Sequence, residues 1–410
     1  MRLTQDAGLD VLGASPEVAA STSAVLDAVR VSGCVSRPEI VRRTGLGKAL
    51  VTERVRALRT WGVLVEQGQL ASNGGRPAQR LKFNSELGYV LAVEIGMTHL
   101  VASAADLSGR LTTSMRRQIE MSLGPEAVLA VAASLMTNIV QGQQPNAGPL
   151  CGIGVGVAGP VEHATGRTIY PPVHPDWHDQ PIRDLLQQRF DVPVWVDNEV
   201  NLMALAEYRN GAAQGHDNAL IFKLGSWVGA GLISNGNLHR GAQGCAGSLA
   251  STSGGEAITK AAAELFHSGD SPRLAQAVDG GAELSVQLVA ECAERGDAAC
   301  QRLLDRAAQD IGKVMAVVVD FFNPSVVVAA GGLVHNSDAL LASIRQHLYG
   351  SALALATRDL QVVRSQLDED AGSLGAALMT LDRIFAPERL SRTLALLCRR
   401  APSAPSVSPR

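Results

Sequence analysis

Apolar side chains recur at helical spacing in the first part of the chain. Between residues 48 and 60, Val51, Val55 and Leu58 fall on one face of a helix. Ser36 is suited to cap an earlier and shorter helix, whose first turn accommodates Pro38. The predicted helices cover 21–32, 36–43 and 48–60, and two extended runs follow at 63–66 and 80–83. Three helices and a hairpin match the plan of a winged helix-turn-helix.

The pattern changes after Leu87, where short buried strands begin to alternate with helices. Residues 89–95 form an apolar run typical of a buried strand, and residues 125–141 carry helical periodicity. Further strands are predicted at 99–105, 151–157, 193–196, 219–223, 230–234 and 325–330, and further helices at 201–209, 256–266 and 284–322. Alternation of this kind predicts an α/β domain.

These patterns divide the chain into four parts. Residues 1–20 are small and polar without periodicity, so we expect them to be disordered. Residues 21–84 form the predicted winged helix-turn-helix, and residues 87–390 form the α/β domain. Residues 391–410 are expected to be a mostly disordered tail, because the end of the chain is rich in proline and serine.

Charge is divided unevenly between these parts. Residues 1–82 carry 12 Lys and Arg against 7 Asp and Glu, a formal charge of +5, whereas the remainder carries 24 against 32, a charge of −8. A basic module joined to an acidic body is expected when only one end of a protein meets nucleic acid. An ordinary basic surface is the alternative interpretation of the charge alone.

Cysteine usage and hydropathy indicate the compartment. The six cysteines are scattered and form no Cys-x-x-Cys pair, which favours reduced thiols in the cytosol. The sequence has no run of 18 uncharged apolar residues, and its first ten residues lack the pattern of a signal peptide. We therefore expect a cytoplasmic protein that associates with the nucleoid.

The third predicted helix carries the side chains best placed to contact DNA. Lys48 and Arg56 can meet phosphates or guanine edges, Thr52 can reach base or backbone, and Leu50 can touch a thymine methyl. The complete set of expected contacts is Arg42, Arg43, Lys48, Leu50, Thr52, Arg56, Arg59 and Arg76. A helix-turn-helix can instead dock another protein, but the basic charge on this side favours DNA.

Arg76 stands apart in this set because it belongs to the expected wing tip. The tripeptide Gly75-Arg76-Pro77 is narrow and extended, so its arginine can enter a minor groove, which A·T base pairs narrow. A surface turn without DNA contact is the alternative. The position of this tripeptide after a helix-turn-helix favours the minor-groove interpretation.

At this point the sequence resembles the ROK family, which contains repressors and sugar kinases, over about residues 20–385. The N-terminal likeness to its repressors rests on 43–46, 58–65 and 75–77. The likeness of the remainder rests on 156–161, 196–201, 206–207, 236–238, 241–247, 323–324, 331–332 and 372–377. The resemblance implies a two-lobed, actin-like ATPase fold behind the winged helix-turn-helix.

The resemblance also implies a kinase site, from which this sequence departs. Glu199 occupies the position of the family's catalytic aspartate, and a longer side chain displaces the carboxylate. Met97 and Trp227 replace glycines of the first two phosphate-binding turns, whereas the third turn, Gly331-Gly332, is kept. We therefore expect no catalytic residue, no kinase activity and no nucleotide cofactor.

The sugar and zinc positions of the family are altered as well. The glutamate and histidine that touch sugar in the kinases are Ser248 and Ser251 here. That histidine also binds zinc with three cysteines in the kinases, and the corresponding region of this chain has no such cysteines, since Cys245 has no partners at zinc-ligand spacing. We expect no metal site.

The framework of the cleft nevertheless remains. The residues expected to contact an effector there are Gly159, His174, Asn198, Glu199, Ser248 and Ser251. The leading hypothesis is a homodimeric or homotetrameric repressor of carbohydrate-related genes that binds a palindromic double-stranded operator and a sugar or sugar-derived effector, away from membranes. The alternatives are an ATP-dependent sugar kinase with a DNA-binding arm and a DNA-binding protein without an effector.

Overall fold

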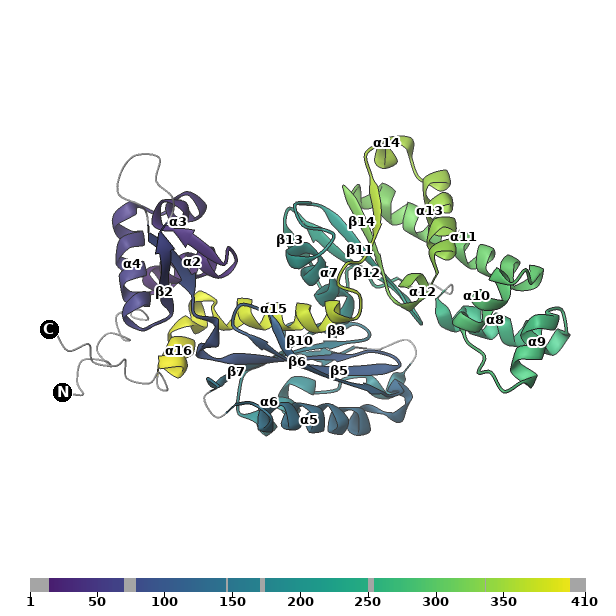
Figure 1. Ribbon diagram of the computed structural model, residues 1–410, viewed down its shortest axis with the longest axis horizontal. Coiled ribbons are helices and arrows are strands. Elements are labelled where there is room, and N and C mark those ends of the chain that lie inside the picture. Colours follow the sequence, from purple (N-terminus) through teal and green to yellow (C-terminus); the bar gives the residue numbers. More distant parts are fainter. Residues whose placement is uncertain are drawn as a thin grey trace.

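The computed structural model describes residues 15–69, 79–144, 147–169, 174–249, 254–335 and 337–398. A small N-terminal module stands beside two lobes, each built on a β-sheet (Figure 1). Helices α7 (Glu199–Asn210) and α15 (Ala371–Ile384) lie between the two sheets and pack against each other. The predicted fold class, a winged helix-turn-helix followed by a two-lobed α/β domain, is confirmed.

The N-terminal module has three helices and a three-stranded sheet. The helices are α2 (Pro16–Arg30), α3 (Arg37–Thr44) and α4 (Lys48–Thr60), and the sheet has the order β1 (Cys34–Ser36), β3 (Gln79–Phe83), β2 (Leu64–Gln69). Ser36 caps α3 by accepting from the backbone N–H of Glu39. The predicted inner face of α4, Val51, Val55 and Leu58, is fully buried. Strand β1 escaped prediction because three residues show no periodicity.

Both predicted disordered ends contain helix. Helix α2 begins at Pro16, because Ser15 accepts a hydrogen bond from Val18 and a proline is tolerated in the first turn. Helix α16 (Pro387–Cys398) extends over residues 391–398 of the expected tail and buries Leu390, Leu394 and Leu397. The prediction of disorder is therefore wrong for 16–20 and 391–398, and residues 1–14 and 399–410 lie outside the described residues.

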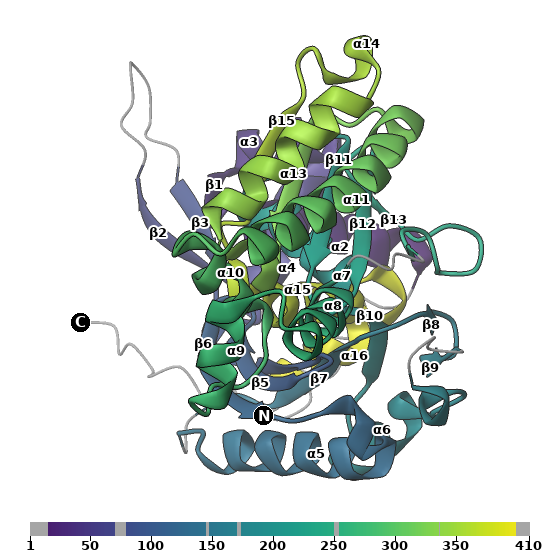
Figure 2. The same ribbon diagram turned by 90° about the vertical axis from the view of Figure 1, so that its right-hand side faces the viewer.

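The first lobe is built on a five-stranded sheet. Its order is β10 (Val194–Asn198), β7 (Leu150–Val157), β4 (Tyr89–Ile95), β5 (His99–Asp106), β6 (Leu111–Gln118). Helices α5 (Pro125–Gln141) and α6 (Ile182–Phe190) cover one face of the sheet, and α15 covers the other (Figures 1 and 2). Shorter elements are η1 (Ser85–Leu87), η2 (Met121–Leu123), β8 (Val161–Glu162), β9 (Arg167–Thr168) and η3 (Pro175–Trp177).

The second lobe repeats this sheet topology. Its order is β13 (Asn237–His239), β12 (Val228–Ser234), β11 (Ala219–Leu224), β14 (Val326–Ala330), β15 (Gln361–Arg364). In both sheets an antiparallel meander is followed by two further strands that run parallel to its first strand. The helices are α8 (Gly255–Ser268), α9 (Pro272–Asp279), α10 (Val286–Glu294), α11 (Ala298–Phe322), α12 (Gly332–His335), α13 (Asp338–Ser351), α14 (Ala354–Thr357) and η4 (Asp368–Asp370).

The long helical stretch predicted at 284–322 is two helices. Gly296 has a φ of 88°, a left-handed conformation that interrupts the stretch after α10. Asp297 then caps α11 by accepting hydrogen bonds from the backbone N–H groups of Ala299 and Cys300. The break lets α10 fold back onto α11, with which it packs.

A continuous apolar core joins the module to the first lobe. Helix α16 packs against α2, and Leu394 belongs to the same buried cluster as Leu26 of the module and Leu381 of α15. The side chain of Phe385 meets that of Phe83 edge to face, with 5.7 Å between the ring centroids. Across the described ranges, none of the helices combines the length and the apolar content needed to cross a bilayer.

Candidate nucleic-acid interface and effector cleft

Helix α4 presents a polar face outside the module. Lys48, Thr52 and Arg56 are exposed there, and Leu50 is half-buried. The Thr52 hydroxyl donates to the carbonyl of Lys48 at 2.8 Å, which keeps its oxygen available as an acceptor. Lys48 and Arg56 form no ion pair with any described residue, so their charges are available to a phosphate or a base edge.

The other predicted DNA contacts have acidic neighbours. Arg42 and Arg43 both pair with Glu39, which precedes them by about one helical turn. Arg59 of α4 pairs with Glu66 of β2 at 2.7 Å. These arginines are exposed, and exposed ion pairs contribute little stability, so an approaching phosphate can compete for them. Arg76 lies outside the described residues.

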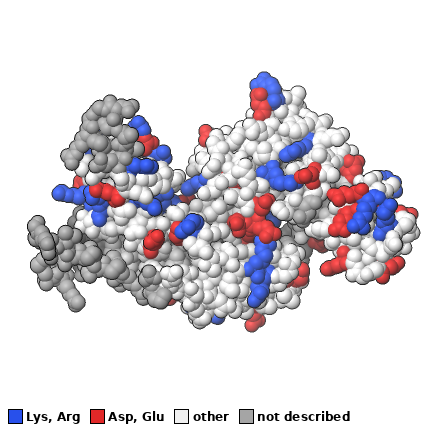
Figure 3. Space-filling view, in the orientation of Figure 1, with Lys and Arg blue, Asp and Glu red and all other residues white. Residues whose placement is uncertain are grey.

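Basic side chains gather over this module on the face shown in Figure 3, whereas acidic and basic side chains alternate at the opposite end of the molecule. One arginine of α4 departs from this exposed pattern. Arg54 is buried and donates from its Nε to the hydroxyl of Ser21 in α2. Arg54 therefore fixes α4 to α2, while Lys48 and Arg56 remain on the surface.

Ion pairs fix the module to the lobes. The Arg30 side chain of α2 is only 3% exposed and pairs with Asp382 of α15 at 2.8 Å and with Asp27 at 3.1 Å. The second carboxylate oxygen of Asp382 pairs with Arg209, near the end of α7, at 3.1 Å. Asp382 thus connects the module to the helix that begins in the cleft.

The cleft is organised where β10 passes into α7. Asn198 caps α7 by accepting from the backbone N–H of Val200 at 2.8 Å, and its amide donates to the carbonyl of Gly159 at 2.8 Å. Gly159 has a φ of 110°, which favours glycine at this position. The structure therefore brings together three of the predicted effector residues, Gly159, Asn198 and Glu199, the first residue of α7.

Glu199 is held by a lysine of the other lobe. Its carboxylate lies 2.6 Å from the ammonium of Lys223 on β11, and both side chains are largely buried. Burial would lower the pKa of Lys223, but the charges of Glu199 and Glu94 outweigh it and raise that pKa. Burial would raise the pKa of Glu94, yet a hydrogen bond from His99 and the charge of Lys223 lower it. The shifts in both pKa values favour the charged forms of Lys223 and Glu94.

A second group of charges surrounds Asp197, the neighbour of Asn198. One carboxylate oxygen of Asp197 accepts from Arg240 at 2.7 Å and lies 3.6 Å from Nδ1 of His163. Arg383 of α15 donates to the other ring nitrogen of His163, so the ring is neutral with its proton on Nδ1. Burial, followed by the charge of Arg240, lowers the pKa of His163. Arg240 follows β13, so its bond to Asp197 joins the two lobes.

Among the described residues, no hydrogen bond or ion pair links the side chain of His174 or Ser248 to these groups. His174 precedes η3 and is partly exposed, and Ser248 is exposed after the sharp turn at Gly247. Neither side chain forms a hydrogen bond within the described ranges. Ser251 lies outside those ranges. Their contribution to ligand binding stays a prediction.

The three turns at Met97, Trp227 and Gly331, which correspond to the phosphate-binding turns of the family's kinases, lie in different surroundings. Met97 packs against the apolar core of the first lobe. In the second turn, the backbone N–H of Gly225 donates to the carbonyl of Trp227 at 3.2 Å. Gly331 has a φ of 97° and lies so close to Leu224 that a side chain would not fit, which explains this glycine structurally.

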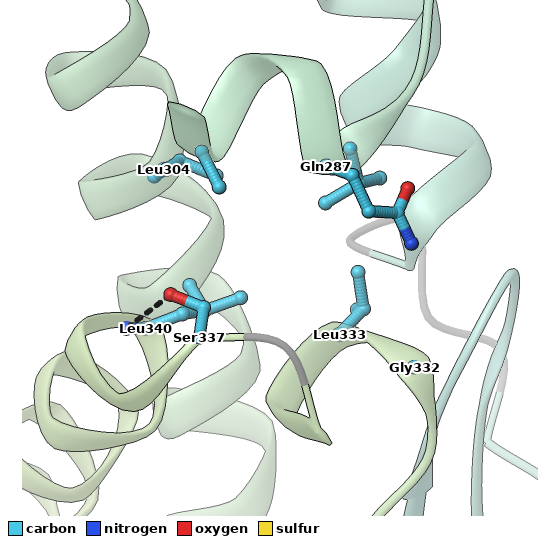
Figure 4. A pocket seen from close by; sticks show the side chains of 8 residues that line it. Gln287, Leu304, Gly332, Leu333, Ser337 and Leu340 are labelled. Carbon is cyan, nitrogen blue, oxygen red and sulfur yellow. Dashed lines mark hydrogen bonds between the residues drawn. The ribbon is translucent and has the colours of Figure 1, made fainter. Parts of the chain in front are cut away.

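A small cavity lies beside the third turn (Figure 4). It lies between α10, α11, α12 and α13 and is lined by Val286, Gln287, Ala290, Leu304, Gly332, Leu333, Ser337 and Leu340. Most of these side chains are aliphatic, and the Ser337 hydroxyl already accepts from the N–H of Leu340 at 3.2 Å. The cavity offers apolar contacts and no titratable side chain.

The ion pairs that join the two lobes were not predicted from the sequence. Lys223 was treated only as the end of a strand, although a lysine in an otherwise apolar strand was a signal for a buried partner. Asp197 and Arg240 carry no comparable signal, because their pairing depends on how the lobes meet. Among the described residues no group of three or more metal-ligating side chains is assembled.

Comparison with known proteins gives the class to which this geometry belongs. The ROK family profile matches residues 90–383, which is well over half of the chain. The chain belongs to the ROK family. The match covers both lobes and α15, and leaves the DNA-binding module and α16 outside it.

Individual relatives include both repressors and kinases. The xylose repressor of Bacillus subtilis is 25% identical over 357 residues, covering 86% of this chain and 92% of that protein. A glucokinase of Halalkalibacterium halodurans is 26% identical over 326 residues, covering 74% of this chain and 98% of the kinase. The crystal structure of a ROK family transcriptional regulator, a homologue of the Escherichia coli MLC protein, superposes with a TM-score of 0.76 at 20% identity, covering 94% and 100% of the two chains. That last likeness confirms the fold.

Proposed function

We propose that this chain is a DNA-binding transcriptional regulator, a repressor of carbohydrate-related genes that senses a small sugar or sugar-derived effector. The observation that carries the proposal is the outer face of α4 in a helix-turn-helix, where Lys48 and Arg56 are exposed and pair with no acidic side chain of the described ranges. The nearly full-length likeness to the xylose repressor supports the same function.

Loss of kinase activity belongs to the proposal. A catalytic base must accept a proton from the sugar hydroxyl, but the Glu199 carboxylate is neutralised by Lys223 at 2.6 Å. Trp227 adds an indole to the turn where kinases of the family have a glycine. A glucokinase is among the relatives, so the alternative is tested by ATP turnover with hexoses and amino sugars, and Glu199→Gln is expected to abolish any true activity.

The regulator is proposed to act as a homodimer or a dimer of dimers. Val317 and Phe321 lie one turn apart on α11 and are 69% and 89% exposed. Leu353 and Leu355 are also exposed, and the N–H of Leu353 bonds to Asp320 of α11, so these side chains extend the same apolar surface. Two copies joined through this surface would present two α4 helices to a palindromic operator. Sedimentation of Phe321→Ser is expected to show a smaller assembly.

Operator binding is the decisive measurement. The full chain is expected to shift DNA from its own promoter region at moderate salt, and a sugar of the regulated pathway is expected to change that affinity. Absence of a shift there and in a genome-wide pull-down would contradict the proposal. A melting temperature that no sugar or sugar phosphate raises would favour a regulator without an effector.

A further inference from the structure

Two helices lead from the cleft toward the DNA-binding module. Helix α7 begins at Glu199 in the cleft, and at 12 residues it is about 18 Å long. Helix α15 has 14 residues, and Gly372 near its start lies so close to the Glu94 carboxylate that a side chain there would collide with it. Figure 1 shows α15 extending from between the lobes to α16 beside the module. Each helix therefore has one end in the cleft and the other toward the module.

Helix α7 is held between the two lobes by close backbone contacts. Gly231 of β12 lies against the carbonyl of Val200, and Gly375 of α15 lies against that of Leu202, so closely that a side chain on either glycine would collide. Helix α15 in turn rests on the first sheet, where Gly154 of β7 touches its backbone just as closely. Interiors packed in this way transmit displacements. A shift of the second lobe against the first is therefore passed to α7 and tilts it on α15.

The module docks on the C-terminal end of α15 through two directional contacts. The buried hydroxyl of Ser23 in α2 donates to the carbonyl of Phe385, which follows α15, at 2.8 Å. Arg30 of α2 donates to Asp382 at 2.8 Å and lies over the ring of Phe385. The apolar core around these contacts is not directional. The two polar contacts therefore set the orientation of α2, and with it that of α4, which Arg54 bonds to α2.

Asp382 is shared between the module and the far end of α7. One of its carboxylate oxygens accepts from Arg30, and the other accepts from Arg209 in the last turn of α7 at 3.1 Å. The Arg30 side chain is 3% exposed, whereas that of Asp382 is 34% exposed, so the carboxylate has more room to move than the cation. A buried cation that loses a partner is costly. Movement of Arg209 therefore changes how firmly Arg30 is held.

We propose that Asp382 is a positioning residue that couples ligand binding in the cleft to the placement of α4 on DNA. This inference rests on the proposed function and specifies how its effector controls the operator. Closure of the lobes on a ligand tilts α7, Arg209 moves the Asp382 carboxylate, and Arg30 then alters the seat of α2 on α15. The Arg30–Asp382–Arg209 relay is the set of ion pairs that carries this coupling.

A cycle of variants tests the relay without a known effector. Arg209→Gln breaks the relay on its α7 side and leaves the Arg30–Asp382 pair, and Glu199→Gln perturbs the cleft end of α7 by weakening its ion pair with Lys223. Operator affinity is measured by fluorescence anisotropy for the wild type, both single variants and the double variant. Glu199→Gln is expected to change operator affinity about 5-fold or more in the wild type and less than about 2-fold when combined with Arg209→Gln.

Xylose, glucose and N-acetylglucosamine provide a second perturbation of the cleft. A sugar that changes the operator affinity of the wild type is expected to bind Arg209→Gln with an affinity within about 3-fold by calorimetry, yet to change the operator affinity of that variant less than about 2-fold. Retained binding with a lost response separates a positioning role from general damage. Arg209→Lys keeps the charge and is expected to keep the response. Arg189→Gln is the matched control, because Arg189 is an exposed arginine in the last turn of α6, across the sheet from α15.

The outcomes separate failure of the relay from failure of the proposed function. Equal responses in Arg209→Gln and the wild type, or an equal loss of response in Arg189→Gln, overturn the relay. A wild type that binds its operator but responds neither to Glu199→Gln nor to any of the three sugars also overturns it, while the DNA-binding function stands. A wild type that binds no operator overturns the proposed function and the relay together.

Discussion

The surface of α4 and the interior of the cleft use charge in opposite ways. On α4, Lys48 and Arg56 are exposed to solvent and form no ion pair with any described residue, while Val51, Val55 and Leu58 of the same helix are buried in the apolar core of the module. In the cleft, Lys223 and Glu199 are removed from water and depend on each other. The exposed charges of α4 are therefore available to bind a partner macromolecule, whereas the buried charges of the cleft are part of the folded structure.

Removal of Lys223 is expected to produce the largest effect. Lys223→Met leaves Glu94 and Glu199 buried without their cation, which should lower the free energy of unfolding by about 3–5 kcal/mol in urea titrations at pH 7. Adding Glu199→Gln should restore a large part of that loss. If Lys223→Met and the double variant are both as stable as the wild type, the buried cleft charges do not stabilise the fold. The contrast with the exposed charges of α4 would then be wrong.

A variant in α16 tests whether the module and the lobes share one core. Leu394→Ala empties a fully buried position and is expected to cost about 2–4 kcal/mol. Since the core is continuous, operator binding and lobe structure should be lost in a single transition on heating. Leu396→Ala on the same helix is the control, because Leu396 is 37% exposed and its truncation should change stability by less than about 0.5 kcal/mol. Two separate transitions would show independent units.

Arg56→Ala, unlike Lys223→Met, is expected to change operator affinity and not the stability of the fold. We expect a loss of about 1–3 kcal/mol in operator affinity, measured by fluorescence anisotropy at fixed salt, with an unchanged melting temperature. Arg358→Ala is the matched control, since Arg358 is an exposed arginine of the second lobe. An equal loss of affinity in the control, or none in Arg56→Ala, would remove α4 from the interface.

The pH dependence of stability gives the smallest expected effect. Burial and nearby arginines lower the pKa of His163 in the folded state, so the unfolded chain binds its proton more readily. Stability associated with this residue is therefore present above about pH 6.5 and is lost as the pH falls below it. His163→Gln should make the urea midpoint less dependent on pH between pH 7 and pH 5.5. The charged groups that face the His163 ring are Arg240, Asp197, Arg383 and Arg183.

The two regions also differ in what the sequence could predict. The bounds of α4, α5 and β4 match the predicted 48–60, 125–141 and 89–95 residue for residue, because apolar periodicity within each segment determines them. Helix α16 was missed although Leu390, Leu394 and Leu397 follow helical spacing, because a proline-rich end outweighed that pattern. The Lys223–Glu199 ion pair and the ion pairs of Asp382 with Arg30 and Arg209 could not be predicted. Each joins elements that are far apart in the sequence and come together only through the arrangement of whole lobes.

Helix α16 has a consequence for synthesis of the protein. The first helix of the module begins at residue 16, but α16, which completes its core, follows both lobes in the sequence and leaves the ribosome after them. N-terminal domains usually fold first during translation. In this chain the operator-binding module reaches its final packing only after both lobes have been made. A prematurely terminated chain therefore lacks a finished DNA-binding unit and cannot occupy an operator that it has no lobes to regulate.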